Sequence, residues 1–227
     1  MNLYPSESDF IDIHSHSGLD DEGVFRIHNI FLSDYHKNSL DRPFSLGLHP
    51  WHIEENKVPN IGNVLTHSSS NPNFFAFGET GLDNLIKTPM LKQIEIFRTH
   101  IECGIQHNKP LVIHCVKAFS ELLSVKKEYK NSSAWIIHGF NANQTIAAEC
   151  VEMGIYISIS QRLLRNPDKA QKIASVVPLS MIFAETDEDS MSIQEVYNGI
   201  SGLYGESVEG VKSRIFKNFF AINGVKN

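Results

Sequence analysis

Eight short apolar segments recur along the chain, and most are separated by stretches with the periodicity of helices. Several are continuously apolar, as in FFAF, LVI, WII and MIFA, which is typical of parallel strands covered on both faces. Strands that alternate with helices predict a parallel sheet, and eight of them predict closure into a barrel. The expected strands are Phe10–His14, Val24–Leu32, Phe44–Leu48, Phe74–Gly78, Leu111–His114, Ala134–His138, Ile155–Ile159 and Met181–Ala184.

Six segments are predicted to be helices. The clearest begins at Thr88-Pro89 and ends before Asn108 and Pro110. Its predicted core-facing stripe is Leu91, Ile94, Phe97, Ile101 and Ile105. The others are residues 118–130, 143–153, 166–176, 192–203 and 207–222. Residues 17–23, between the first two strands, are too few for a helical crossover. We therefore expect an α/β fold, a distorted TIM (β/α)8 barrel with an incomplete helical ring in its first third.

Composition is that of a folded protein, since 41% of the 227 residues are hydrophobic and 20% are charged. The chain has no repeat or low-complexity linker, so residues 1–227 are expected to form one domain. A net charge of -6 excludes a broadly basic surface that holds nucleic acid by charge alone. Three cysteines without a CxxC pair, no signal-peptide pattern and no long apolar run predict a cytoplasmic protein without membrane spans.

Histidines and carboxylates follow the predicted strands directly. The first strand ends in D-I-H-S-H, in which His14 and His16 share one face because residues two apart in a strand project the same way. Later strands run into G-E-T-G-L-D, I-H-C, I-H-G and E-T-D. The carboxyl ends of barrel strands meet at one rim, where four imidazoles and two carboxylates would form a nitrogen and oxygen ligand set for divalent cations. The pattern predicts a metal site.

The ordered motifs D-I-H-S-H, G-L-H-P-W, G-E-T-G-L-D, L-V-I-H-C, I-I-H-G-F and E-T-D resemble those of the TatD-type metal-dependent hydrolases, a branch of the amidohydrolase-like superfamily. The resemblance implies a distorted barrel, a centre of one or two metals and hydrolysis of phosphodiesters, typically of DNA. Carried over by position, it implies that one metal is held by His14, His16, Glu79 and Asp187. It implies that a second is held by Glu79, His114 and His138, with Glu79 bridging.

Two residues receive catalytic roles under this resemblance, Glu79 as the bridge and Asp187 as the group that orients or deprotonates the attacking water. Two cations about 3.5–4 Å apart can activate a shared water, polarise a phosphoryl oxygen and stabilise the leaving oxygen. Mg²⁺, Mn²⁺ and Zn²⁺ all suit the ligand set.

The sequence departs from the family on the substrate side. An arginine commonly follows the fifth-strand histidine by two residues, and here that position is Val116, with Lys117 beside it as a candidate phosphate contact. Glu188 and Asp189 replace a small residue and proline, and they are either solvated loop charges or groups that repel a phosphate backbone.

Further residues are expected near the rim. His49 either orients a ligand or substrate or caps a turn fixed by Pro50. Asp83 and Glu185 are expected to support the site or to cap helices. Trp51 either stacks on a base or plugs the barrel mouth. His100 is expected on the surface of its helix.

The sequence thus favours a hydrolase that uses one or two divalent cations to cleave phosphodiester bonds of DNA. One alternative is the same chemistry on a small-molecule ester, amide or phosphate, motivated by Val116 and the acidic loop. The other is a weakly active metal-binding protein with an interaction role. A monomer is favoured, and the expected partner is DNA or a small phosphoester.

Overall fold

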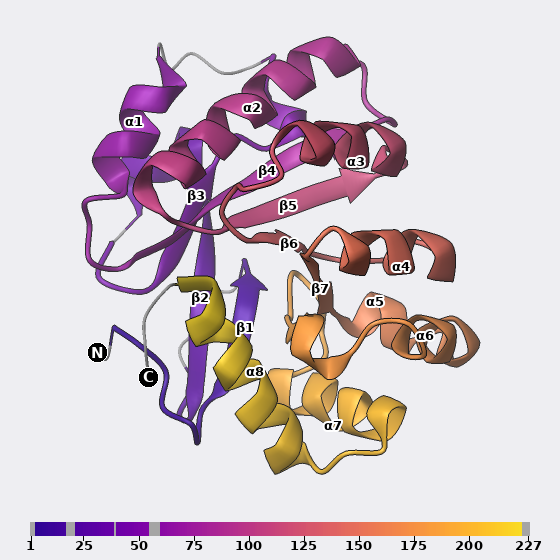
Figure 1. Cartoon of the computed structure of the whole chain (residues 1–227). Helices are drawn as coiled ribbons and strands as arrows, with labels where there is room; N and C mark the ends of the chain where they lie inside the picture. Colours follow the sequence, from indigo (N-terminus) through magenta and orange to yellow (C-terminus); the bar gives the residue numbers. More distant parts are fainter. Residues whose placement is uncertain (1–2, 17–20, 39, 55–59, 224–227) are drawn as a thin grey trace. The chain divides into compact units, whose positions relative to one another are not determined.

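The computed structural model describes residues 3–16, 21–38, 40–54 and 60–223 (Figure 1). All eight predicted strands are present in one sheet whose order follows the sequence, β1 to β8. The pairs β2–β3, β3–β4, β4–β5 and β7–β8 are parallel. The strands are β1 (Phe10–Ser15), β2 (Val24–Phe31), β3 (Phe44–Gly47), β4 (Phe74–Asp83), β5 (Leu111–Val116), β6 (Trp135–Ile137), β7 (Ile155–Ile159) and β8 (Ile182–Ala184).

The chain groups into two compact units. The terminal unit comprises Met1–Ile27 and Ile137–Asn227, and the central unit comprises His28–Ile136. The expectation of one domain over residues 1–227 stays a prediction.

In the terminal unit, helices α7 and α8 pack on strand β1. The phenol of Tyr197 accepts the Ile11 N–H (3.0 Å) and donates to the Ile11 carbonyl (3.1 Å), so α7 is fixed to β1. Strand β1 also lies beside β8, where Ser15 and Asp187 form a parallel bridge. The helices of this unit are α4 (Gln144–Glu152), α5 (Gln161–Leu164), α6 (Pro167–Ala174), α7 (Ile193–Tyr204) and α8 (Val208–Asn223), with the 3-10 helix η3 (Leu179–Met181).

The core of the central unit is aromatic. Phe74 contacts Phe44 and Phe77 with ring centroids 5.5 and 4.8 Å apart, and Phe97 contacts Trp135 at 5.2 Å. All five rings are at most 1% exposed. The helices of this unit are α1 (Ile61–Ser68), α2 (Met90–His107) and α3 (Phe119–Glu128), with the 3-10 helices η1 (Leu32–Lys37) and η2 (Pro50–His52).

The helical ring is incomplete in the first third of the chain, as predicted. Among the described residues no helix lies between β1 and β2, and β2 is followed by the 3-10 helix η1 alone. Helix α1 was not predicted, and its start is marked by Asn60, whose side chain accepts the Asn63 N–H (3.3 Å).

Strand β4 is longer than predicted, because it continues past Gly78 to Asp83. Its second half pairs with β5, with Gly81 opposite His114. Gly81 has a φ of 140°, and a Cβ there would lie 2.1 Å from the His114 carbonyl oxygen. The absence of a side chain at Gly81 therefore lets the two backbones meet, which places Glu79 inside the sheet rather than in a loop.

The predicted stripe of α2 is wrong at both ends. Leu91 is 82% exposed and Ile105 is 47% exposed. The buried residues are Gln93, Phe97, His100, Ile101, Cys103 and Gly104. The buried face includes polar groups because Gln93 and His100 make hydrogen bonds to the backbone of neighbouring segments. Hydrophobic periodicity therefore could not locate this face.

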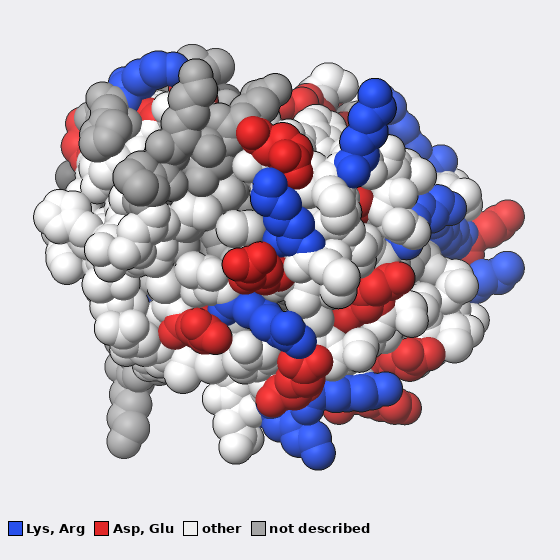
Figure 2. All heavy atoms as spheres, turned by 90° about the horizontal axis from the view of Figure 1, so that it is seen from above, with Lys and Arg blue, Asp and Glu red and all other residues white. Residues whose placement is uncertain are grey.

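On the face drawn in Figure 2, lysine and arginine side chains are interspersed with aspartates and glutamates. This agrees with the net charge of -6. Within the described chain, none of the helices has the length and apolar character needed to cross a membrane.

Candidate metal centre

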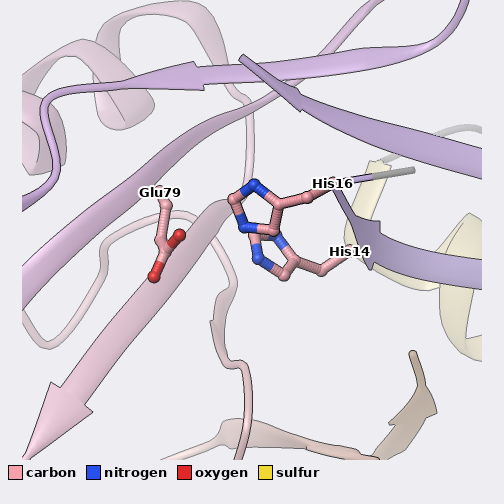
Figure 3. Close-up of side chains that lie close together, drawn as sticks. All are labelled: His14, His16 and Glu79. Carbon is pink, nitrogen blue, oxygen red and sulfur yellow. The ribbon is translucent and has the colours of Figure 1, made fainter. Parts of the chain in front are cut away.

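The terminal unit brings together four of the predicted ligands, His14, His16, His138 and Asp187, here called the terminal cluster. His14 lies on β1 and His16 comes directly after its last residue (Figure 3). Their ring centroids are 5.1 Å apart, and each has its Nε2 within 3.7 Å of the Asp187 Oδ1. The His14 and His138 rings lie 4.3 Å apart. His14, His138 and Asp187 each offer a ligand atom within 4.8 Å of the others.

Backbone hydrogen bonds place Asp187 in this cluster. Its N–H donates to the His14 carbonyl (3.0 Å), and its carbonyl accepts the His16 N–H (3.2 Å). The preceding Thr186 donates through both its N–H (3.0 Å) and its hydroxyl (2.7 Å) to Asp12, which is completely buried. Asp12 thus fixes the end of β8 against β1.

Glu185 supports the His138 corner. It is completely buried and accepts the N–H of Gly139. Burial raises the pKa of Glu185 to about 8, with a further upward contribution from Asp187 and an opposing one from His138. Glu185 is thus bonded to the residue after His138, and its supporting role stays a prediction.

The central unit gathers His49, Glu79, Asp83 and His114, here called the central cluster. The Glu79 Oε1 lies 3.1 Å from His49 Nε2 and 2.9 Å from His114 Nδ1. The other nitrogen of His114, Nε2, lies 3.4 Å from the Asp83 Oδ2. Glu79 and Asp83 are each 3% exposed, so both carboxylates are removed from water. His49, Glu79 and His114 each offer a ligand atom within 4.8 Å of the others.

His49 caps a turn, which is one of its two expected roles, and it also faces Glu79. Its Nδ1 accepts the N–H of Trp51 (3.2 Å) at the start of η2, while its Nε2 faces Glu79. The preceding Leu48 donates its N–H to His100 Nε2 (3.1 Å). His100 in turn donates through Nδ1 to the Ile96 carbonyl (2.8 Å). The helix α2 therefore fixes the backbone that carries His49.

Asp83 is held by its own set of hydrogen bonds. Its N–H donates to the Gln93 side chain (2.8 Å), and its carbonyl accepts from the same amide group (2.9 Å). The carboxylate accepts the Trp51 indole N–H (2.8 Å) and the Leu85 N–H (2.8 Å). Burial raises the pKa of Asp83, but these hydrogen bonds and His114 outweigh burial and leave the pKa below its ordinary value.

The predicted phosphate contact is not brought into either cluster. Lys117 is exposed, has a φ of 52°, and makes no hydrogen bond or ion pair with any residue that the structure describes. Glu188 is exposed, and Asp189 accepts a hydrogen bond from the Gln161 amide (3.3 Å). Glu188 is thus a solvated charge, and Asp189 is bonded to the first residue of helix α5.

The donor atoms of both clusters fit a divalent cation. Each cluster combines imidazole nitrogens, which suit Zn²⁺, with a carboxylate, which suits Mg²⁺ and Mn²⁺. In the central cluster two imidazoles face one oxygen of a buried carboxylate.

Comparison with known proteins gives a family. The model of the family described as "TatD related DNase" matches residues 32–223. The chain belongs to the TatD-related DNase family. The match begins after His14 and His16, so the D-I-H-S-H motif lies outside it.

Curated relatives agree with this membership. An uncharacterised metal-dependent hydrolase from Buchnera aphidicola is 32% identical over 165 residues, which are 71% of this chain and 62% of the relative. The human 3'-5' RNA nuclease TATDN2 is 28% identical over 63% of this chain and 19% of its own. The chain thus spans about three fifths of the first relative and a smaller part of the second.

The fold has a close counterpart among solved structures. The crystal structure of YJJV, a TatD homologue from Escherichia coli K12, superposes with a TM-score of 0.81 at 18% identity, covering 97% of this chain and 100% of that one. This likeness confirms the predicted eight-stranded α/β barrel.

Sequence reasoning missed two residues that position the predicted ligands and their neighbours. Asn29 accepts the Glu79 N–H (2.9 Å), and His100, expected on the surface, is fully buried. One signal for His100 was available, since it lies three residues after Phe97 and four before Gly104 on the buried face of α2. For Asn29 there was no local signal, because its partner is 50 residues away.

Proposed function

We propose that this TatD-family protein is a metal-dependent hydrolase that cleaves phosphodiester bonds of DNA. The observation that carries the proposal is that each unit separately gathers three potential ligands within 4.8 Å, namely His14, His138 and Asp187 in one, and His49, Glu79 and His114 in the other. Such grouping of imidazoles and carboxylates from different strands is typical of a divalent-metal site.

The ligand assignment is part of the proposal. Where two cations are bound, Glu79 is proposed to be a ligand of both. His49 is a further candidate ligand, because it lies in the central cluster. Bound divalent cations would lower the pKa of a water and stabilise charge on the phosphoryl group. The proposed ligands of one or two cations, Mg²⁺, Mn²⁺ or Zn²⁺, are His14, His16, Glu79, His114, His138 and Asp187.

The chain's own groups have separate proposed tasks. Asp187, whose side chain is 30% exposed, orients the attacking water and accepts its proton. Asp12 and Thr186 hold Asp187 in place, while Glu185 holds the segment after His138 through Gly139. Asp83 orients His114 through their contact at 3.4 Å.

Two further aspects are proposed on less direct support. The three cysteines of the chain are free thiols, which supports a reducing, cytoplasmic location. The protein is also proposed to be a monomer, and its partner is proposed to be DNA or a small phosphoester.

A small phosphoester is the second candidate substrate. It is favoured by Val116 in the position of the family's arginine, by the exposed Lys117 and by the acidic pair Glu188 and Asp189. Repulsion by these acids would weaken with rising salt concentration. The net charge of -6 also means that charge alone would not hold a DNA backbone.

The test uses protein reconstituted separately with Mg²⁺, Mn²⁺ and Zn²⁺. Hydrolysis of a single-stranded oligonucleotide and of bis(p-nitrophenyl) phosphate is compared in the same buffers. Glu79→Ala should reduce turnover at least about 100-fold because it removes a shared ligand, while the matched variant Glu95→Ala, at an exposed position of α2, should not. Turnover of the small ester with intact DNA would refute the DNase proposal, and near-wild-type activity of Glu79→Ala would refute a metal mechanism through Glu79.

A further inference from the structure

Trp51 presents a large aromatic surface to solvent. Of the chain's two tryptophans, Trp51 is 59% exposed and Trp135 is fully buried. The expectation that Trp51 plugs the barrel mouth is therefore disfavoured by its exposure. A single exposed apolar side chain is common on protein surfaces, so exposure by itself implies nothing about function.

The distinguishing property of Trp51 is that its ring is fixed. The indole N–H donates to the Asp83 Oδ2 at 2.8 Å, and Asp83 is a buried carboxylate whose other oxygen accepts the Leu85 N–H. The backbone N–H of Trp51 donates to His49 Nδ1 at 3.2 Å. An exposed side chain anchored at both ends loses little further conformational freedom when a ligand binds on it.

The 59% exposure of Trp51 leaves part of its ring surface open to solvent. The neighbouring rings of His49 and His114 lie 4.9 and 6.0 Å from the indole with interplanar angles of 84° and 75°. Both contacts are edge-on, so among the described residues no ring is stacked flat on Trp51. The indole N–H is already used by Asp83, and the side chain has no other polar group to recognise a ligand.

Trp51 is also adjacent to the proposed metal ligands. The same Asp83 oxygen that accepts the indole N–H lies 3.4 Å from His114 Nε2. A group stacked on Trp51 would therefore lie beside the central cluster, within one side chain of Glu79.

We propose that Trp51 is a stacking platform for a nucleobase adjacent to the phosphodiester that is cut, fixed by Asp83. The inference rests on the proposed function, and it specifies the substrate as nucleic acid with an unpaired base. Stacking suits a sequence-tolerant enzyme because every base has a π face, whereas hydrogen bonds would select particular bases. It also supplies affinity that the charge of -6 does not.

A binding test is independent of turnover. Tryptophan fluorescence of the purified protein is titrated with thymidine 5'-monophosphate and, as the matched ligand without a base, with deoxyribose 5-phosphate. The base should quench wild-type emission, the sugar phosphate should not, and Trp51→Phe should lose the quenching while Trp135 still reports that the protein is folded. No quenching at millimolar nucleotide, or equal quenching in Trp51→Phe, would overturn the proposal.

A kinetic test compares a single-stranded oligonucleotide with the same strand carrying an abasic residue at the positions that flank the cut. Trp51→Ala should lower kcat/KM about 5- to 150-fold more for the natural strand than for the abasic strand, with Trp51→Phe in between. Ile105→Ala, which alters an exposed apolar residue at the end of α2, should change neither. Equal losses on both strands would refute stacking even if DNA is cleaved. If wild-type protein cleaves no DNA, the proposed function fails and the fluorescence result still decides the role of Trp51.

Discussion

Replacement of His100 by glutamine should make the stability of this protein less sensitive to acid. The His100 imidazole is completely buried, donates through Nδ1 to the Ile96 carbonyl and accepts the Leu48 N–H at Nε2. Because Nε2 accepts a hydrogen bond, it carries no proton, and these two bonds therefore require the neutral form of the imidazole. Burial lowers the pKa of His100 from 6.5 to about 4, although the hydrogen bond to Ile96 acts in the opposite direction.

The sign and size of the effect follow from proton linkage. Between about pH 6.5 and 4 the unfolded chain binds a proton at His100 and the folded chain does not, so stability falls as the pH is lowered through this window. The free energy of unfolding should therefore fall by about 2 kcal/mol between pH 7.5 and pH 5 from this residue alone.

Urea unfolding of metal-free protein at both pH values measures this difference. Wild type should lose about 2 kcal/mol more than His100→Gln on acidification. Glutamine also retains an acceptor for Leu48, so its cost at pH 7.5 should be near 1 kcal/mol, whereas His100→Leu leaves the Leu48 N–H without that acceptor and should cost about 1–3 kcal/mol more.

A matched control is His67→Gln, which alters an exposed histidine of helix α1 in the same unit. Its pH-dependent loss should equal that of wild type. If His100→Gln and wild type lose the same stability on acidification, then His100 is not held neutral and the argument from its burial is wrong.

Three further predictions concern other parts of the molecule. Thr186→Val should lower the free energy of unfolding by about 1–3 kcal/mol, measured in urea, because it removes hydroxyl bonds to Asp12 (2.7 Å) and Ser15 (3.0 Å); an unchanged midpoint would contradict this. Gly81→Ala should cost at least about 3 kcal/mol in thermal or urea unfolding because its Cβ would overlap the backbone of β5, and a stable variant would show that β4 can shift. Lys117→Ala should raise KM for a phosphorylated substrate several-fold at low salt if this exposed side chain reaches phosphate; equal KM values would assign Lys117 to the solvent surface.

The fold could be read from the sequence because its signals are local. Continuous apolar runs such as Phe74–Phe77 identify strands that are buried on both faces, and signals such as Thr88-Pro89 mark where a helix between strands begins. The end of β4 could not be read in this way. Its extension to Asp83 depends on pairing with β5 across Gly81, which is a contact between segments distant in sequence.

The amphipathic helix α2 shows a second limit. Periodicity placed Leu91 and Ile105 in the core, yet both are exposed, while Gln93 and His100 are buried. A buried polar residue is tolerated where its hydrogen bonds are satisfied. Those bonds go to Asp83 and Leu48, on other elements, so the pattern within the helix could not reveal them.

The sequence by itself determined the eight strands, the family and which imidazoles and carboxylates follow strand ends, because these depend on short apolar runs and residue spacing. Tertiary structure alone decided how those side chains are held. It placed His49 against Glu79, bonded Asp187 to His14 through the backbone, and fixed the exposed ring of Trp51 on Asp83. The physical reason is that a hydrogen bond between segments far apart in sequence depends on atomic positions, which residue types and local periodicity do not encode.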